Sequence, residues 1–556
     1  IHTVKCRMQH TKIPVLWYRT GEYTKKISNC AELRMYATLF HMNTPTHQTR
    51  LSREDYLLIS VLLAVTLIFR LWTVMMIHTG IDERDYWYSA KAISQGAAIE
   101  YPYINHRTVR WGVIVPVAVQ QLITGVSPNA YYTMPILNAL VQTLLLYLLG
   151  RKLFGKKTAV LATLCLIFFP YQIRAASQVR PEIFSLTYIL AMVYFFSGYV
   201  FGTDARKQIR SLMLSALMLF FAYQAKITNL FFMPGMFVLI FLQKPQKKIP
   251  HSILFGAIPL AGFILETLIY RIFFGYRFGH LEIISANHLG GMDALGSFLE
   301  IFNRYAPEYL QAYWQIPFVV FAVLTVWTLI RNRDTRLILL IVPALSFFFF
   351  ITFTVSSINP LKMAEPFINR YFSAVLPLVF LVLMQYAVTG MERIAVFAKV
   401  RAVGSKYCTL ILGGGALLFM IVFSLPVVPR GIRKYIVPPF SSDHPFALNR
   451  EYREILNQAW AEGTPIVACD GNAGRDALGT AAWYYLDASG FNNASAPHPV
   501  STEEPAGLEQ QIASLDGVSL EQKDSVVAVI RRPFRVKTLR VDALNALEPE
   551  SFPGDD

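Results

Sequence analysis

The sequence predicts a polytopic α-helical membrane protein, and three observations support this fold class. Hydrophobic residues make up 54% of the 556-residue chain and charged residues only 16%, whereas charged residues are about a quarter of a typical soluble protein. The apolar residues come in long runs that suit membrane-spanning helices. Lys and Arg concentrate in short loops between these runs, so the net charge of +15 indicates membrane orientation rather than nucleic-acid binding.

The first segment, residues 1–54, is mostly polar and basic, and we expect it to form a cytoplasmic N-terminal tail. It contains no apolar core of the signal-peptide type. The chain begins at Ile1, and the stretch that starts at Met42 looks like a natural start. Residues 1–41 are therefore, as an alternative, an extension that does not belong to the native protein.

Length and apolarity predict about eleven membrane spans within residues 55–428. We expect them near residues 55–78, 131–150, 158–171, 183–202, 211–223, 227–242, 252–273, 314–330, 337–355, 371–390 and 408–428. Five basic loops fall on one side of the membrane if the N-terminus is inside, namely residues 151–157, 204–210, 243–248, 331–336 and 393–406. Their agreement predicts a multi-pass protein of the cytoplasmic membrane with its N-terminus inside.

The first predicted outer loop begins with an acidic stretch, residues 80–96. Three acids and then a set of residues at helical spacing mark it: Asp82, Glu83, Asp85, Tyr86, Ala90 and Ile93. This spacing predicts a short helix that starts at the acids. Carboxylates are rare beside a hydrocarbon boundary unless they have a function. The alternative is that they only cap the helix, since helix N-termini favour negative charge.

The same loop continues with a basic segment, residues 101–112, which contains His106, Arg107 and Arg110. An amphipathic stretch follows at residues 112–123. It is too short and too closely flanked by charge to cross the membrane. We therefore expect a helix that lies in the membrane interface.

After the last predicted span the composition changes, and residues 429–556 are soluble in character. Residues 464–470 and 524–533 are typical of buried strands, and residues 474–490 are typical of a helix between them. We expect a small α/β domain outside the membrane. It contains no Gly-rich phosphate loop, so no nucleotide site is predicted.

The outer face would bring carboxylates together with Arg and Lys side chains. A carboxylate can take a proton from an attacking hydroxyl, while Arg and Lys can hold a phosphate leaving group. Lys226 and Arg370 are the leading phosphate candidates, because each lies close to an apolar run where an unpaired cation is expensive. For Arg174, Arg277 and Lys362 we favour snorkelling to lipid headgroups.

Four stretches of the chain resemble GT-C fold glycosyltransferases, in particular the bacterial protein-mannosyltransferase-like and aminoarabinose-transferase-like enzymes. The first is DERDYWYSAKAISQG at residues 82–96, which is similar to the first outer loop of that family. The others are residues 153–182, which end in Arg-Pro-Glu, the lysine-bearing AYQAKITNLFFMPG at 222–235, and INRYFSAVLPL at 368–378. The resemblance covers about residues 55–390, and with the last predicted span it implies a GT-C-like transmembrane domain for residues 55–428.

The resemblance implies a polyprenyl-phosphate-linked sugar donor and transfer outside the cytoplasmic membrane, with Asp82 as the base. The acceptor would be a hydroxyl of a lipid, a glycan or a protein. Two adjacent carboxylates tend to raise one pKa, which would suit a base. In one respect the chain departs from the family, because Arg107 and Arg110 stand in HRTVRWGVIVP where a Pro-rich stretch is usual. This departure leaves the class of acceptor open.

The candidate site residues fall into three groups. We expect Asp82 and Glu83 to be catalytic, with Glu83 orienting the acceptor or a helix terminus and Asp85 facing solvent. The candidates for donor phosphate binding are Lys226, Arg370 and Arg180, and those for acceptor or substrate binding are Tyr86, His106, Arg107, Arg110 and Glu182.

The five cysteines have no paired spacing, so the sequence predicts neither a disulfide framework nor a zinc site. No metal ligands are assigned, and any need for a divalent metal stays open.

A transporter or flippase of a lipid-linked sugar is the main alternative function. Such a protein would be expected to show internal repeats and broken spans in matching halves, and the sequence shows no repeat. A eukaryotic lumenal mannosyltransferase of the same fold and a non-catalytic scaffold are further alternatives. The expected partners are membrane lipids, the sugar donor and the acceptor.

Overall fold

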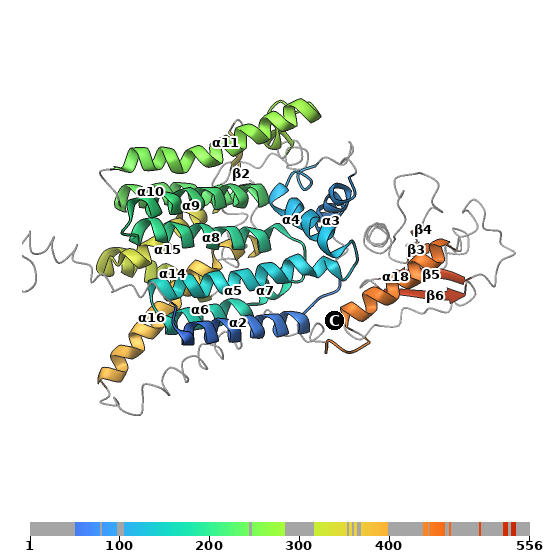
Figure 1. Ribbon diagram of the computed structural model, residues 1–556, viewed down its shortest axis with the longest axis horizontal. Helices are drawn as coiled ribbons and strands as arrows, with labels where there is room; N and C mark the ends of the chain where they lie inside the picture. The colour runs from blue at the N-terminus through green and yellow to red at the C-terminus, as the bar shows by residue number, and fades with distance from the viewer. Residues whose placement is uncertain are drawn as a thin grey trace, which may run out of the picture. The chain divides into compact units, whose positions relative to one another are not determined.

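The computed structural model describes residues 51–77, 81–96, 105–243, 247–283, 316–352, 355–358, 361–363, 369–397, 438–442, 444–461, 466–468, 500–501, 526–531 and 535–540. These residues are mostly helical, as Figure 1 shows. The long helices are α2 (Arg53–Trp72), α5 (Thr133–Leu153), α6 (Lys156–Phe168), α8 (Pro181–Phe201), α9 (Ala205–Ala225), α10 (Met233–Gln243), α11 (Lys248–Phe274), α14 (Ile316–Trp327), α15 (Thr335–Thr352) and α16 (Leu376–Phe397).

Shorter elements connect the long helices. They are α3 (Ile81–Ser94), α4 (Trp111–Thr124), η1 (Ala130–Tyr132), α7 (Pro170–Ala175), η2 (Ile227–Phe232), the π-helical turn η4 (Thr328–Asn332) and η5 (Asn369–Ala374). The helices expected after the first span and at residues 112–123 are confirmed as α3 and α4.

Within the described residues, five helices are long and apolar enough to cross a membrane. They are Arg53–Trp72, Ala130–Leu153, Pro181–Phe201, Lys248–Phe274 and Thr335–Thr352. Shorter apolar helices accompany them at Trp111–Thr124, Ile227–Leu242, Pro317–Arg331 and Leu376–Gly390. The membrane character is thus supported, while the count of eleven spans stays a prediction. The last expected span, 408–428, lies outside the described residues.

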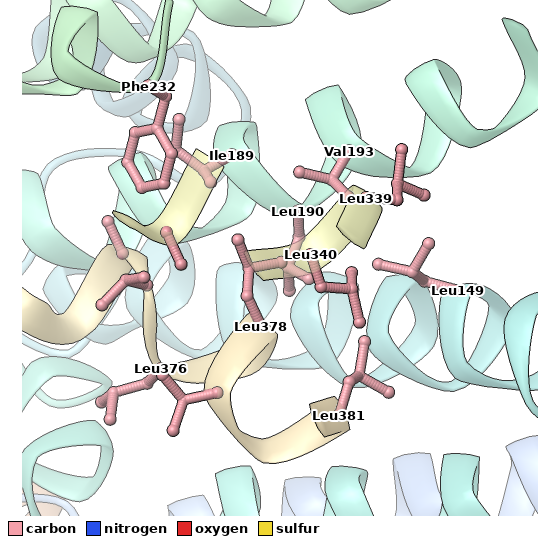
Figure 2. Close-up of a cluster of buried hydrophobic side chains, with 14 of the residues drawn as sticks. Leu149, Ile189, Leu190, Val193, Phe232, Leu339, Leu340, Leu376, Leu378 and Leu381 are labelled. Carbon is pink, nitrogen blue, oxygen red and sulfur yellow. The ribbon is translucent and has the colours of Figure 1, made fainter. Parts of the chain in front are cut away.

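The largest apolar core surrounds α8, most of whose side chains are buried because the helix is apolar on all sides. Figure 2 shows its residues grouped with side chains of α5, η2, α15 and α16: Leu149, Ile189, Leu190, Val193, Phe232, Leu339, Leu340, Leu376, Leu378 and Leu381. In a membrane such contacts stabilise the bundle by close packing rather than by removal from water. Gly150 permits one close approach, since a Cβ there would lie 2.9 Å from Ala159 Cα.

A buried ion pair lies at the start of α2. Asp55 is fully buried, and its Oδ1 accepts hydrogen bonds from the Tyr147 hydroxyl at 2.8 Å and from Arg151 Nε at 2.9 Å. A carboxylate in such surroundings is stable only when it is paired. The pair therefore joins α2 to α5 at this end of both helices.

A proline fixes how α4 meets α8. Pro116 lies inside α4 and has no N–H to donate to the carbonyl of Gly112 one turn earlier. The Tyr188 hydroxyl of α8 donates to that carbonyl instead, at 3.0 Å. The hydrogen bond that the proline removes from the helix is thus replaced by one between two helices.

The C-terminal part has strands in the order β4-β3-β5-β6. Their bounds are β3 (Ile466–Ala468), β4 (Val500–Ser501), β5 (Val526–Arg531) and β6 (Arg535–Arg540), and α18 (Pro445–Ala461) precedes them. β3 is parallel to β4 and β5, and β5 is antiparallel to β6. Strands were expected at the positions of β3 and β5. The helix expected at residues 474–490 lies outside the described residues.

One further strand pair belongs to the segment between α15 and η5. β1 (Val355–Ile358) and β2 (Leu361–Met363) pair in antiparallel fashion. The helix expected at residues 337–355 ends earlier than predicted, since α15 stops at Thr352 and β1 begins at Val355.

Candidate active site

The acids of α3 differ sharply in exposure. The side chains of Asp82, Glu83 and Asp85 are 32%, 1% and 12% exposed. The two aromatic residues that follow, Tyr86 and Trp87, are fully buried and fix one face of the helix against its neighbours. The expectation that Asp85 faces solvent is wrong, because a turn between α3 and α4 covers it.

That turn is built by Asn105. Its side-chain oxygen accepts hydrogen bonds from the backbone N–H of Arg107 at 2.7 Å and of Thr108 at 3.2 Å, a local pattern typical of Asn. Its amide nitrogen donates to Asp85 Oδ2 at 3.2 Å. The turn therefore both places Arg107 and covers one acid of α3.

Two arginines from this turn bind α3. Arg107 Nε donates to Asp82 Oδ1, and its Nη1 lies 3.4 Å from Asp85 Oδ2. Arg110, at the start of α4, donates from Nη1 to the Tyr86 hydroxyl at 2.5 Å and lies over the Tyr86 ring. The basic residues that replace the expected Pro-rich stretch are therefore paired with the acidic helix. His106 precedes Arg107 in the turn and is half-buried.

The Arg-Pro-Glu turn at the start of α8 contacts both neighbouring parts of the site. Arg180 has an extended backbone, as expected before a proline, and Pro181 opens the helix. Arg180 Nε donates to Glu83 Oε1, while Glu182 Oε1 accepts from Lys226 Nζ at 2.9 Å. Three successive residues thus connect α3 to the end of α9.

Lys226 terminates α9 and is 9% exposed. Its ammonium lies 3.5 Å from the centre of the Tyr371 ring in addition to its pair with Glu182. A desolvated cation over an aromatic face gains electrostatic attraction from the ring. Arg370, the other leading phosphate candidate, precedes Tyr371 in η5, and its side chain is outside the described residues.

Burial shifts the pKa of two of the three acids. It raises the pKa of the Glu83 carboxyl above its usual range, and Arg180 opposes this only in part. Burial likewise raises the pKa of Asp85, against the pull of Arg84 and Arg107. Glu83 is therefore the acid of α3 that is least able to act as an accessible anion.

The structure thus pairs most of the predicted site residues with one another: Asp82 with Arg107, Glu83 with Arg180, Tyr86 with Arg110, and Glu182 with Lys226. Sequence reasoning missed Asn105 and Tyr371, which support these pairs. Neither carries a signal in a single sequence, because Asn in a loop and an aromatic residue near a membrane are both common.

A second buried carboxylate was also missed. Glu266 of α11 accepts hydrogen bonds from the Tyr223 hydroxyl and Gln224 Nε2, both at 2.9 Å, and pairs with His280 Nδ1 at 3.0 Å. The sequence could have indicated Glu266, because a lone carboxylate within a 27-residue apolar helix is rare without a function. The described residues include no group of three or more His, Cys, Asp or Glu placed to hold a metal ion.

Comparison with known families gives one match. Residues 117–270 match the family described as dolichyl-phosphate-mannose-protein mannosyltransferase. The match covers less than half of the chain and includes Arg180, Glu182 and Lys226 but not Asp82. It confirms the resemblance to GT-C glycosyltransferases that the motifs indicate, and it suggests polyprenyl-phosphate-dependent glycosyl transfer. No curated protein matches the sequence.

Solved structures with a similar run of helices are distant in sequence. ArnT from Cupriavidus metallidurans bound to undecaprenyl phosphate has 12% identity and a TM-score of 0.47, covering 87% of this chain and 94% of ArnT. Archaeoglobus fulgidus AglB, in complex with an inhibitory peptide and a dolichol-phosphate, has 11% identity and a TM-score of 0.49, covering 88% and 75%. The apo oligosaccharyltransferase of Archaeoglobus fulgidus has 12% identity and a TM-score of 0.46, covering 80% of this chain. The chain spans 65% of the length of that relative.

Proposed function

We propose that this protein transfers a sugar from a polyprenyl-phosphate donor to a hydroxyl acceptor at the outer face of the cytoplasmic membrane, with Asp82 as the general base. The proposal extends the family match, which covers residues 117–270, to the acidic helix that precedes it. It keeps the expected orientation, with the N-terminal tail (residues 1–54) inside, the transmembrane domain at 55–428, and residues 429–556 outside.

The observation that carries the choice of base is the difference in exposure along α3. Asp82 retains 32% of its side-chain exposure while Glu83 retains 1%. A general base must come within hydrogen-bond reach of the proton that it takes. Asp82 satisfies this requirement, because part of its carboxylate stays accessible beside its contact with Arg107. Glu83, buried against Arg180, is assigned to holding the start of α3 in place.

Lys226 and Arg370 are proposed to bind the donor phosphate, with Arg180 as a further contributor. Lys226 is a buried ammonium held by one carboxylate, Glu182, and one aromatic ring. A donor phosphate that approached this poorly hydrated ammonium would accept a charge-assisted hydrogen bond from it. Glu182 would then orient the ammonium or a sugar hydroxyl. Tyr86, His106, Arg107 and Arg110 would line the acceptor side.

The reaction would be a single displacement at the anomeric carbon. The acceptor hydroxyl passes its proton to Asp82 while its oxygen forms the new bond to that carbon. The bond from carbon to the phosphate oxygen breaks, and the lipid phosphate leaves with the electron pair. Lys and Arg neutralise the charge that develops on the phosphate. The leaving group needs no proton, and the sugar configuration inverts.

The decisive experiment is sugar transfer by the purified full chain in liposomes, with synthetic polyprenyl-phosphate sugars as donors and a membrane extract as the source of acceptor. A labelled product that requires the protein supports the proposal. Movement of the donor between leaflets without any glycosylated product would instead favour the flippase alternative. The expected topology is tested separately, by labelling an engineered cysteine in α18 with an impermeant maleimide in intact cells.

A further inference from the structure

A second polar cluster centres on the buried carboxylate of Glu266, which the proposed reaction does not use. Glu266 accepts hydrogen bonds from Tyr223 and Gln224 near the end of α9, and one from His280 Nδ1. The side chains of His280 and Glu266 are 1% and 7% exposed. A carboxylate in such surroundings is stable only with partners of this kind. The cluster therefore joins the end of α9 to the chain that follows α11.

That following chain, residues 275–283, folds back onto α11, and we call it the return segment. α11 ends at a glycine in the left-handed conformation, which lets the chain reverse. Gly279 has a φ of 58° and lies close to α11, since a Cβ there would be 3.0 Å from Thr267 Cα. His280 follows directly and bonds to Glu266 at 3.0 Å. This bond thus fixes the return segment to the helix that it leaves.

The return segment packs against the turn that joins α3 to α4. A buried apolar cluster connects the two, and its members are Val109, Trp111, Tyr270, Tyr276 and Ile283. The Trp111 indole also donates to the Tyr270 hydroxyl of α11. Val109 lies between the two arginines of the turn that bind α3. A shift of the return segment would therefore act on both arginines.

We propose that His280 is a positioning residue for the candidate base. Its pair with Glu266 holds the return segment against the turn, and the turn holds Arg107 on Asp82. A third of the Asp82 side chain is exposed, so packing restrains it only in part and the contact with Arg107 contributes to its orientation. A displacement of about 1 Å at a reacting group can cost about 10²-fold in rate. This inference rests on the proposed function and adds to it a residue that touches no substrate.

The His280 ring offers a selective pair of substitutions. Its Nδ1 bonds to Glu266, whereas its Nε2 is buried and has no hydrogen-bond partner among the described residues. An Asn side chain places an amide nitrogen near the position of Nδ1, and a Gln side chain places one near Nε2. His280→Asn should therefore keep the bond to Glu266, and His280→Gln should lose it.

The structural test is hydrogen exchange of the turn, measured by mass spectrometry on the full chain in liposomes. These backbone N–H groups donate hydrogen bonds within the turn: Arg107, Thr108, Arg110 and Trp111. His280→Ala and His280→Gln should speed exchange in peptides covering residues 105–111 by about tenfold, the scale expected when a hydrogen bond to a charged group is lost. His280→Asn should exchange as the wild type does.

His251→Ala is the matched control for a buried histidine. His251 lies in the first turn of α11, and its Nδ1 bonds to the Tyr199 hydroxyl at 2.8 Å. Its replacement also removes a buried hydrogen bond, but at the opposite end of that helix. Exchange of the turn should therefore stay at the wild-type rate.

The kinetic test is a double-mutant cycle with Arg107. His280→Ala should lower kcat about tenfold and leave the KM for the donor unchanged, because it displaces the base rather than the phosphate site. In an Arg107→Gln background the same substitution should have little further effect, since it acts through Arg107.

Three results would overturn the proposal: unchanged exchange of the turn in His280→Gln, equal acceleration in His251→Ala, or multiplicative losses of kcat in the cycle. If His280→Ala does not fold, the Asn and Gln variants provide both measurements. An absence of transfer by the wild type would count against the proposed function instead, and the exchange result would then decide whether His280 holds the turn.

Discussion

Carboxylates lie near both ends of the first span, and the two ends differ in what their pairing leaves accessible. At the start of α2, Asp55 is fully buried, with Tyr147 and Arg151 as hydrogen-bond donors. Beyond the end of α2, Asp82 also pairs with an arginine, yet a third of its side chain is exposed. An ion pair alone therefore does not identify a reactive group. The combination of a charge partner with remaining access separates the candidate base from a structural acid.

The largest effect should follow from removing the base. Asp82→Asn keeps the shape of the side chain and removes its ability to accept a proton. Turnover should fall by roughly 10²-fold or more, the usual scale for loss of a general base. The measurement is sugar transfer in liposomes, with thermal unfolding checked alongside. Near-normal transfer would return α3 to the role of a capped interfacial helix.

Donor binding should show the next largest effect. Lys226→Ala and Arg370→Ala should each weaken donor use by about tenfold or more, because each removes a charge-assisted hydrogen bond to the phosphate. Lys226→Ala also leaves Glu182 buried without its cation, so the double variant with Glu182→Gln is the better test of binding. The dependence of rate on donor concentration gives the result. Unchanged affinity in both phosphate variants would move the phosphate site to Arg174 and Arg180.

The other two acids of α3 should matter less than Asp82. Glu83→Gln should lower transfer by a few-fold, about a kcal/mol, because it weakens the pair with Arg180 that positions the helix. Asp85→Asn should cost least, since Asn105 and Arg107 can still bond to its amide oxygen. Parallel assays of the three variants give the ranking. A larger loss for Glu83→Gln than for Asp82→Asn would exchange their roles.

Asp55→Asn tests the other half of the comparison. It should leave the transfer rate per folded molecule unchanged and lower the free energy of unfolding by about 1–3 kcal/mol, since buried donors lose a charged partner. Thermal unfolding in detergent and transfer in liposomes would be measured on the same preparation. Loss of transfer without loss of stability would show that accessibility does not separate the two acids.

The smallest expected effect is a dependence of stability on pH at Glu83. Because burial raises its pKa in the folded protein, its contribution to stability is present below the ordinary Glu pKa and is lost as pH rises through the folded value. The melting temperature of the wild type relative to Glu83→Gln should therefore fall as pH is raised from about 4 to about 8. A difference that grows with pH would mean that Arg180 outweighs burial.

The sequence allowed the helices and the residue types of the site to be predicted, but not the pairing between them. The positions of α2, α5, α8 and α11 could be predicted directly from the apolar runs, since length and hydropathy decide which segments suit a membrane. The acidic helix could be placed by its spacing. That Arg180 would pair with Glu83 depends on how α8 packs against α3, and hydrophobic periodicity does not contain this information.

The burial of Asp85 was mispredicted for a related reason. Its cover comes from Asn105, twenty residues later in the chain, and a turn conformation is needed to bring the two together. Glu266 was missed although its position in an apolar helix carried a signal. Contacts between distant segments are thus the part of the site that required a structure.

The replacement of a helical hydrogen bond at Pro116 has a consequence for communication across the protein. The Gly112 carbonyl has the Tyr188 hydroxyl as its partner, so α4 cannot shift away from α8 without leaving that carbonyl unsatisfied in a poorly hydrated region. A displacement of α4 would therefore act on the first turns of α8, which carry Glu182 and, through it, the Lys226 ammonium. The position of α4 and the pairing of Lys226 with Glu182 would then be thermodynamically linked, and such linkage acts equally in both directions.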